Sequence, residues 1–259
     1  MSSTSTPATD DRLTVIAISA LTYILPDVLH EGLGHGVTAW LSGANRLTMS
    51  TVALQSDVSN RWISANGTLV NLLFGVIFWL LLWKPRRYRP ATRYFLVLMM
   101  ASNLFVGTGY FFFSGVTNFG DWAAVIDGWH PHWMWQVGLV VVGIASYYAS
   151  MMWVAAQLRP FVGRLRPLMW TPYLTDGIIA GVGGLLNPLG LFYVIASALP
   201  STLGANAGLL SIPLIMRGWK SREDDRVGPI PRSTGWIVSG AVASVVFVFV
   251  IGRGLHWSR

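Results

Sequence analysis

Apolar residues occur in long, nearly continuous runs that short polar segments separate. Seven runs have about the length, roughly 20 residues, that a helix needs to cross a hydrocarbon core roughly 30 Å thick. They cover residues 13–41, 64–83, 94–113, 134–158, 171–186, 189–216 and 235–251. Asn187, Pro188 and Pro200 interrupt the fifth and sixth runs, which could instead form a single pass and a re-entrant segment. The pattern predicts an all-α membrane protein, a polytopic bundle of six or seven transmembrane helices.

Composition supports a membrane protein and narrows its chemistry. Hydrophobic residues make up 53% of the 259 residues and charged residues 11%, whereas a soluble chain has about 25% charged residues. Cysteine is absent, so a metal ion would have to be bound by His, Asp or Glu. No segment has the pattern of a nucleic-acid-binding domain, and we expect no nucleic-acid partner despite the net charge of +7.

The positive charge gathers in three short loops between predicted helices. These loops hold thirteen of the 18 basic residues: Lys84, Arg86, Arg87, Arg89 and Arg93, then Arg159, Arg164 and Arg166, then Arg217, Lys220, Arg222, Arg226 and Arg232. By the positive-inside rule the three loops are cytoplasmic, and residues 43–63 and 114–133 face the other side. We expect a multi-pass integral protein of the bacterial inner membrane.

The chain divides into three parts. Residues 1–12 are rich in Ser and Thr, carry Asp10 and Asp11, and predict a disordered tail. Residues 13–133 hold the first three predicted helices and the candidate chemistry, and residues 134–259 supply additional transmembrane helices. Between the first two helices, residues 46–55 alternate apolar and polar side chains, which favours a short strand or hairpin. An extended substrate could pair with that strand.

The candidate chemistry lies in the first predicted helix, at His30-Glu31-Gly-Leu-Gly-His35. The chain has five histidines and only two glutamates, and here one glutamate stands between two histidines. A charged group inside an apolar helix costs roughly 2.5 kcal/mol or more, so the cluster indicates function. The structural alternative is a pair of buried, hydrogen-bonded histidines that join helices.

The functional interpretation is a zinc site. His30 and His35 would be two ligands, a carboxylate the third and water the fourth, with Glu31 as the general base. In the familiar H-E-x-x-H pattern the histidines lie four residues apart and share one helix face. Here the spacing is five, which turns them roughly 140° apart on a regular helix. A π-turn would realign them, and Gly32 and Gly34 make that distortion inexpensive.

The order of motifs resembles the site-2 protease family of intramembrane zinc proteases. That family has a His-Glu motif on a transmembrane helix, then a strand-containing loop, then a G-x-x-x-N element, which Gly67-Thr-Leu-Val-Asn71 matches here. The resemblance covers residues 20–128 and implies a third ligand from an Asp and a role for Asn71 in binding the substrate backbone or stabilising the oxyanion. The proline-rich stretch before the family's Asp is missing, and the His spacing is longer. That spacing is similar to the H-E-L-L-G-H motif of the dipeptidyl peptidase III family.

Asp121 and Asp127 are the candidates for the third ligand. Asp121 follows the third predicted helix on the same side as the histidines, and Gly120 would let the chain bend towards the metal ion. Asp127 retains the Asp-Gly pair that the resemblance implies. Asp176 lies near a cytoplasmic loop, whereas His30 lies about 17 residues, roughly 26 Å, into the first span. We therefore expect Asp121 to complete the site.

Other polar residues have two interpretations each. Asp27 could orient an imidazole from outside the ligand set, or form a hydrogen bond within the helix after Pro26. Asn71 and Asn103 lie inside apolar spans, where interhelical hydrogen bonding explains them as well as substrate binding does.

These features predict a zinc-dependent intramembrane hydrolase, a site-2-protease-like peptidase that cleaves a membrane-embedded or membrane-adjacent segment. Its cofactor would be Zn²⁺, and its partners a membrane protein or peptide substrate and the lipid bilayer. Two other functions fit the same residues. One is a non-catalytic metal-binding membrane protein, such as a transporter or sensor, and the other is a zinc hydrolase of a lipid-linked amide.

Overall fold

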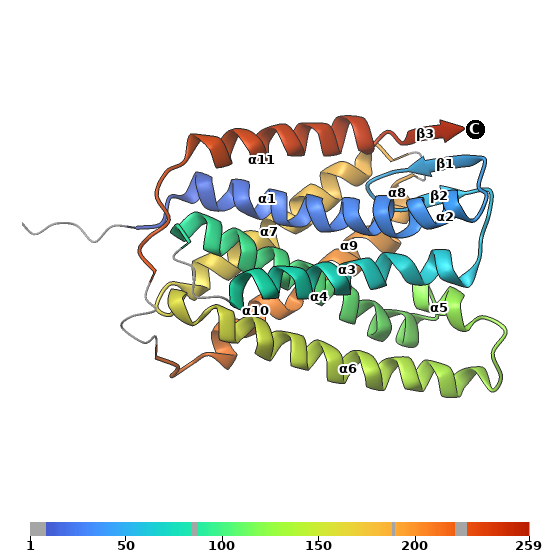
Figure 1. Ribbon diagram of the computed structural model, residues 1–259, viewed down its shortest axis with the longest axis horizontal. Coiled ribbons are helices and arrows are strands. Elements are labelled where there is room, and N and C mark those ends of the chain that lie inside the picture. The colour runs from blue at the N-terminus through green and yellow to red at the C-terminus, as the bar shows by residue number, and fades with distance from the viewer. Residues whose placement is uncertain (1–8, 84–87, 188–189, 221–226, 259) are drawn as a thin grey trace, which may run out of the picture.

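The protein is an elongated bundle of helices with a small sheet at one end (Figure 1). A computed structural model describes residues 9–83, 88–187, 190–220 and 227–258. The helices are α1 Arg12–Val28, η1 Leu29–Gly36, α2 Val37–Leu41, α3 Arg61–Trp83, α4 Pro90–Thr117, α5 Asp121–Ile126, α6 His132–Gln157, η2 Arg159–Phe161, α7 Leu165–Leu185, α8 Leu191–Tyr193, η3 Val194–Ala198, α9 Leu199–Ala205, α10 Ala207–Ile215, α11 Thr234–Val246 and η5 Phe247–Ile251. The strands are β1 Arg46–Met49, β2 Leu54–Ser56 and β3 Leu255–Ser258.

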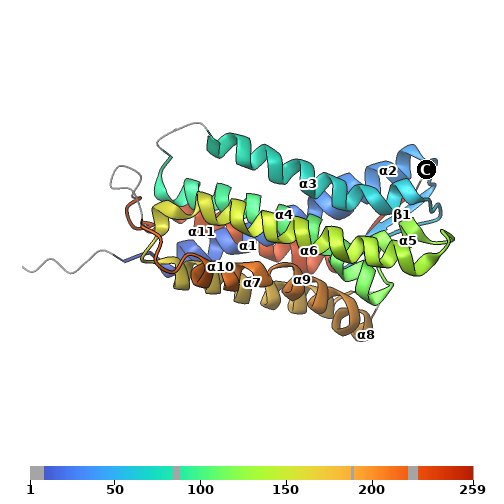
Figure 2. The same ribbon diagram turned by 90° about the horizontal axis from the view of Figure 1, so that it is seen from below.

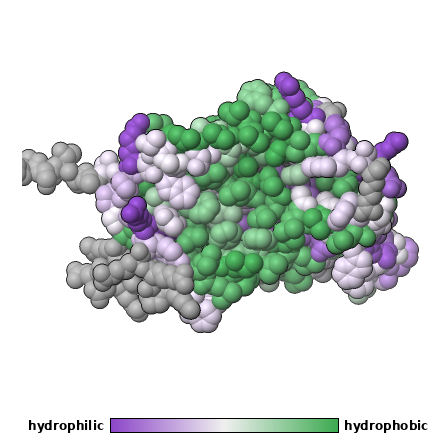
Figure 3. Space-filling model, turned by 45° about the horizontal axis from the view of Figure 1, so that its top comes forward, coloured by the Kyte–Doolittle hydropathy of each residue, from purple (hydrophilic) through white to green (hydrophobic). Residues whose placement is uncertain are grey.

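Five helices in the described residues are long and apolar enough to cross a membrane. They are Arg12–Leu41, which joins α1, η1 and α2, then Arg61–Trp83, Pro90–Thr117, His132–Gln157 and Thr234–Ile251. Each coincides with one of the predicted apolar runs. In the space-filling view a broad hydrophobic belt covers the middle of the molecule, and hydrophilic side chains gather towards both ends (Figure 3). This distribution is the one a bilayer requires of a spanning protein.

The remaining two predicted spans are helical but differ from the other five. The helix α7 has 21 residues and is not among those five. After it the chain returns through the short helices α8, η3, α9 and α10, which together run back along the bundle (Figure 2). Asn206 separates α9 from α10, and Pro200 lies in the first turn of α9. The predicted interruption is present as a broken helical path, but the break between α9 and α10 is at Asn206 and not at Pro200, and Pro188 lies outside the described residues.

The chain runs back and forth along the long axis, which separates two ends (Figure 1). At one end of the bundle α3 leads to α4, α6 leads to α7, and α10 leads to α11. The basic residues of the three loops that the structure describes therefore lie at this end. Residues 84, 86, 87, 222 and 226 of those loops lie outside the described residues. At the other end lie α2, α5, α8 and the sheet. The candidate chemistry is therefore at the end opposite the basic loops.

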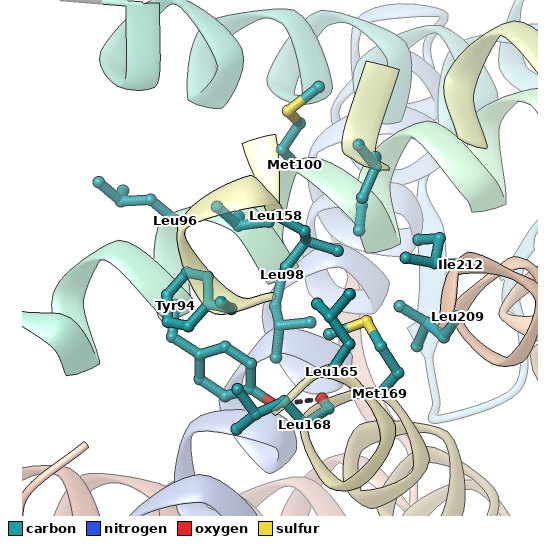
Figure 4. Packing of buried hydrophobic residues seen from close by; sticks show 14 of the residues in the cluster. Tyr94, Leu96, Leu98, Met100, Leu158, Leu165, Leu168, Met169, Leu209 and Ile212 are labelled. Atoms are coloured by element: carbon teal, nitrogen blue, oxygen red, sulfur yellow. Dashed lines mark hydrogen bonds between the residues drawn. The ribbon is translucent and has the colours of Figure 1, made fainter. Parts of the chain in front are cut away.

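An apolar core fills the bundle towards the basic end. Tyr94 and Leu98 of α4 pack there with Leu158 after α6, Leu168 of α7 and Leu209 of α10 (Figure 4). The Tyr94 hydroxyl satisfies its hydrogen-bonding capacity by donating to the Leu168 carbonyl oxygen at 2.7 Å. These buried side chains join α4, the end of α6, α7 and α10.

The sheet has the strand order β2-β1-β3, and both strand pairs are antiparallel. The predicted strand or hairpin between the first two helices is thus present as β1 and β2. The third strand was not predicted: Arg46 pairs with Ser258, more than two hundred positions away. Because β1 is paired on both sides, only β2 offers an edge next to the candidate site, and not the whole segment 46–55.

The predicted tail is ordered at its C-terminal end. Residues 1–8 lie outside the described residues, but Asp10 pairs with Arg164 and accepts a hydrogen bond from the Ile230 amide at 2.7 Å. Asp11 caps α1, since its carboxylate accepts from the Thr14 amide at 2.9 Å. Hydrogen bonds from the Thr14 amide and the Thr14 hydroxyl group lower the pKa of the Asp11 carboxyl. The predicted disorder through residue 12 therefore does not extend to Asp10 and Asp11.

Candidate metal centre

The motif His30 to His35 lies on an eight-residue π-helix, η1. Its amides bond five residues back, as the Val37 amide does to the Gly32 carbonyl oxygen. This wider turn brings side chains five positions apart onto one face. The predicted π-turn is therefore confirmed, and the His30 and His35 Nε2 atoms lie 3.0 Å apart. Both histidines are buried.

Each imidazole is held through its Nδ1 atom by an oxygen acceptor. His30 Nδ1 is 2.6 Å from the Asn71 side-chain oxygen, and His35 Nδ1 is 2.6 Å from the Ile63 carbonyl oxygen. The Asn71 amide nitrogen donates to the Pro26 carbonyl oxygen and to the Asn103 side-chain oxygen, which fixes the orientation of the Asn71 amide group. Both Nδ1 atoms must therefore carry the proton. In neutral imidazoles the two Nε2 atoms are then lone-pair acceptors.

Asp121, at the start of α5, directs its carboxylate at the same point. Its Oδ2 atom is 3.1 Å from His30 Nε2 and 3.4 Å from His35 Nε2, and it has no hydrogen-bond partner in the described part of the chain. Asp121 therefore presents a buried carboxyl oxygen to both Nε2 atoms.

The three atoms form a triangle that suits a small metal ion. Its sides are 3.0, 3.1 and 3.4 Å. Ligand atoms about 2.0–2.1 Å from a tetrahedral zinc ion lie about 3.3–3.4 Å from one another. Three acceptors that converge without a donor repel one another, so a cation between them satisfies all three. These three residues also form the one group of possible metal ligands found among the described residues.

Two glycines allow α3 to approach the histidines closely. A Cβ atom on Gly67 would lie 2.4 Å from His35 Nε2 and 2.7 Å from His30 Nε2. A Cβ atom on Gly34 of η1 would lie 2.5 Å from the Gly67 Cα atom. The first residue of the G-x-x-x-N element is therefore glycine because a side chain would occupy the space next to the ligand atoms.

Asn71 is held inside the protein by three hydrogen-bonding partners. The resemblance implies a contact with substrate, but Asn71 is completely buried and its amide group bonds His30, Pro26 and Asn103. It is a positioning residue for His30, and the interhelical hydrogen bond with Asn103 that was the alternative is present. Such partners of a ligand histidine fix its tautomer and orientation.

The other acidic candidates lie away from the triangle. Asp127 ends α5, and its carbonyl oxygen accepts from the Arg61 guanidinium at 2.7 Å. Asp176, in α7, accepts from the Asn206 amide at 2.8 Å. Neither belongs to the convergent group, which agrees with the prediction that favoured Asp121. Asp27 does not orient an imidazole, because Asn71 and the Ile63 carbonyl oxygen occupy both Nδ1 atoms.

Glu31 is buried beside the triangle and lines an open cleft. The cleft has a volume of about 580 Å³, and Glu31, His35 and Asp121 all line it. One Glu31 oxygen accepts a hydrogen bond from the Leu54 amide of β2 at 2.6 Å. Residues 52–56 form one wall of the cleft. A carboxylate, the candidate metal ligands and a strand edge therefore meet in one space that solvent or a substrate can enter.

Tyr110 of α4 is a residue that the sequence pattern did not single out. Its ring stacks on His30 with 5.2 Å between ring centroids, and it also lines the cleft. An aromatic residue in an apolar helix carries no signal of such a contact. The contact of the Ile63 carbonyl oxygen with His35 could not be predicted either, because every residue has a backbone carbonyl group.

Comparison with protein-family models, with curated proteins and with solved structures gives no significant match, so the function has to be inferred from these side chains.

Proposed function

We propose that this protein is a zinc-dependent membrane hydrolase of the site-2-protease-like kind, which cleaves a peptide bond in a membrane-embedded or membrane-adjacent segment. The observation that carries the proposal is the convergence of His30 Nε2, His35 Nε2 and Asp121 Oδ2 within 3.4 Å, with both Nδ1 atoms directed at acceptors. Two imidazoles and one carboxylate are the ligands of many catalytic zinc sites. When bound there, zinc would polarise the scissile carbonyl group and make a water molecule more acidic.

Glu31 is the proposed general base. It follows His30 directly, is buried, and lines the same cleft as His35 and Asp121. Its carboxylate would take a proton from the attacking water as the water oxygen bonds to the carbonyl carbon. When the carbon–nitrogen bond breaks, Glu31 would return this proton to the leaving amine. The Leu54 amide holds one carboxylate oxygen and so fixes the direction of the group.

The edge of β2 is the proposed binding place for the substrate backbone. β2 is one of the two outer strands of the sheet, and it forms a wall of the cleft next to Glu31. Because the Leu54 amide points away from β1 and towards Glu31, the backbone groups on this edge face the cleft. An extended segment that pairs with β2 would run past Glu31 and Asp121. Unwinding of a helical substrate would be needed for this pairing.

We also propose that the protein crosses a bacterial inner membrane seven times. The seven passes would be the five long apolar helices, α7 and the broken helical path α8–α10. Charge supports one orientation of this bundle. The described residues of the basic loops lie at the end away from the metal centre, so the positive-inside rule puts the cleft near the non-cytoplasmic face. Its substrate would then be cut close to that face.

The test is the variant Glu31→Gln, assayed on candidate membrane substrates in detergent or vesicles. Glutamine has nearly the same volume but cannot accept the proton, and general-base assistance is worth about 10² to 10⁴ in rate. Because the same group also protonates the leaving amine, we expect a loss at or above the upper end, with zinc retained. The control is Asp127→Asn, which makes the same acid-to-amide change at an exposed residue outside the convergent group.

A zinc-loaded Glu31→Gln protein that cleaves at close to the wild-type rate would contradict the hydrolase. Unchanged metal transport or sensing in that variant would instead favour the non-catalytic metal-binding alternative. Cleavage of a lipid-linked amide and not of a peptide would keep the base and change the substrate class.

A further inference from the structure

An apolar groove lies between α6 and the helices α9 and α10, and α4 packs against both of its sides. Its volume is about 490 Å³. Figure 2 shows α9 and α10 running along the bundle beside α6. Val116, Ile144 and Tyr148 line the groove and are 56–60% exposed. In a membrane these apolar and aromatic side chains would face lipid, so the groove would open sideways into the bilayer.

The groove is long and narrow. On α6 its lining runs from Gly143 to Met151, and along α9 and α10 it runs from Pro200 to Ser211. At about 1.5 Å per residue these stretches are about 12 and 16 Å long. A volume of about 490 Å³ over that length corresponds to a mean cross-section of about 30–40 Å². A helix with its side chains is about 10–12 Å across and fills roughly 80–110 Å². The groove therefore suits one slender chain and not a whole helix.

The wall of the groove suits a hydrocarbon chain. It includes apolar side chains such as Phe112 and Met151. The hydroxyl groups of Thr117, Ser201 and Tyr147, which also line it, donate to backbone carbonyl oxygens. Because these donors are already used, an extended peptide in the groove would leave many of its backbone groups unpaired. An acyl chain has no such groups to pair.

The groove meets the open cleft at Tyr110 and Phe113, which line both. Tyr110 also stacks on His30. The groove therefore begins beside the candidate metal centre, and along α6 it extends towards the basic end as far as Met151. With the cleft near the non-cytoplasmic face, a chain in the groove would point from that face towards the middle of the bilayer. The acyl chains of that leaflet have the same direction.

We propose that the groove holds a linear acyl chain carried by the substrate, so that the substrate is an acylated peptide. Its peptide part would lie in the cleft along β2, and its acyl chain would lie between α6 and α9. This inference rests on the proposed hydrolase and narrows its substrate class. A phospholipid chain would gain little by leaving the bilayer, because lipid tails are as apolar as the wall. A chain linked to a peptide in the cleft is held by both parts at once.

Photocrosslinking tests the groove without requiring cleavage. The probe is an alanine–leucine hexapeptide whose N-terminal dodecanoyl chain carries a diazirine near its far end. It is added to zinc-loaded Glu31→Gln protein in phospholipid nanodiscs, where lipid chains compete for the groove. We expect saturable labelling of residues that line the groove. An excess of the dodecanoyl peptide without diazirine should remove the labelling, the octanoyl peptide should remove less, and the acetyl peptide little, because only the longer chain fills the groove.

Gly204→Leu, added to the same protein, blocks the groove with a side chain. A Cβ atom on Gly204, which lines the groove, has no neighbour within 4 Å, so leucine is accommodated and takes the space of the chain. We expect labelling at least tenfold lower. Gly138→Leu is the matched control, because a Cβ atom on Gly138 also has no neighbour within 4 Å and Gly138 does not line the groove. Ala207→Leu fills the groove from α10 at an exposed position and should act as Gly204→Leu does.

Cleavage supplies a second readout on the wild-type base. For a peptide that the protein cleaves, a dodecanoyl group should raise kcat/KM above that of the acetyl form, and Gly204→Leu should lower the ratio of the two at least tenfold. Gly138→Leu should keep that ratio. Because both forms are compared in the same nanodiscs, their partitioning into lipid cancels between the variants.

Three results would overturn the acyl groove. They are labelling that does not saturate, labelling that both Gly204→Leu and Ala207→Leu leave unchanged in folded protein, and equal displacement by the acetyl peptide. The last would favour side chains of a membrane segment as the occupant. A failed hydrolase gives a different result, namely saturable labelling of the groove without cleavage of any candidate membrane substrate. Cleavage without saturable labelling would keep the hydrolase and contradict the acylated substrate.

Discussion

The two ends of the bundle interior are built from the same helices but from different residues. Towards the basic loops, α4 contributes Tyr94 and Leu98 to an apolar core that also includes residues of α7 and α10 (Figure 4). Towards the opposite end, α4 contributes Asn103 and Tyr110, and α1 continues into η1 with its buried His30. An apolar interior is sufficient to hold helices together. The polar end costs free energy in the same bundle and therefore indicates a function.

Because the two ends differ, substitutions can separate stability from chemistry. Changes at the apolar end should alter the free energy of unfolding and leave metal binding intact. Changes at the polar end should alter metal binding more than they alter the fold.

The largest effect is expected for Gly67→Ala. The new methyl group would lie within 2.7 Å of both histidine Nε2 atoms, in the space where a metal ion would be bound. We expect zinc to be lost from the purified protein, measured by elemental analysis. Gly138→Ala is the matched control, because a Cβ atom on Gly138, in helix α6, has no neighbour within 4 Å. A zinc-loaded Gly67→Ala protein would show that the ligands do not converge as described.

At the apolar end, Leu98→Ala should destabilise the protein without releasing zinc. Leu98 is 1% exposed in the core cluster, and a buried Leu→Ala change costs about 2–5 kcal/mol through lost contacts and a cavity. We expect a lower midpoint of thermal unfolding and an unchanged zinc content. Leu73→Ala, at a side chain that is 56% exposed on α3, should lower the midpoint much less. Loss of zinc from folded Leu98→Ala would show that the two ends are not independent.

A smaller effect is expected for Asn71→Leu, which removes the partner of His30 Nδ1 but keeps the ligands. Loss of such a positioning group typically lowers metal affinity by about 10- to 100-fold. Competition with a chelator of known zinc affinity would measure the change. Asn66→Leu is the control on the same helix, because the Asn66 amide bonds Thr38 and not a histidine. Equal zinc affinities of these two variants would remove Asn71 from the metal centre.

Much of the fold could be predicted because a helix in a membrane is specified by its own residues. The five long apolar helices, the hairpin and the π-turn all follow from local patterns of hydrophobicity, of alternation and of histidine spacing. The pairing of β1 with β3 could not be predicted, since nothing local links Arg46 to Ser258. The break at Asn206 is similar, because a short polar interruption does not say how the chain continues.

The candidate site shows the same division. Residue type and spacing singled out His30, His35 and Asp121, because few ionisable residues occur in apolar helices. The role of Asn71 depends on how α3 is rotated against η1, which the close contact between Gly34 and Gly67 determines. Sequence spacing carries no information on that rotation, so the hydrogen bond between Asn71 and His30 could not be predicted.

We propose that His30, His35 and Asp121 together bind one zinc ion. Elemental analysis of the purified wild type beside His30→Ala, His35→Ala, Asp121→Asn and Asp127→Asn tests this binding, with folding checked by circular dichroism. We predict about one zinc ion per wild-type chain, loss of that ion in the first three variants, and full retention in Asp127→Asn. A folded wild type that binds no zinc when zinc is supplied, or zinc that stays after loss of either histidine, would contradict the account.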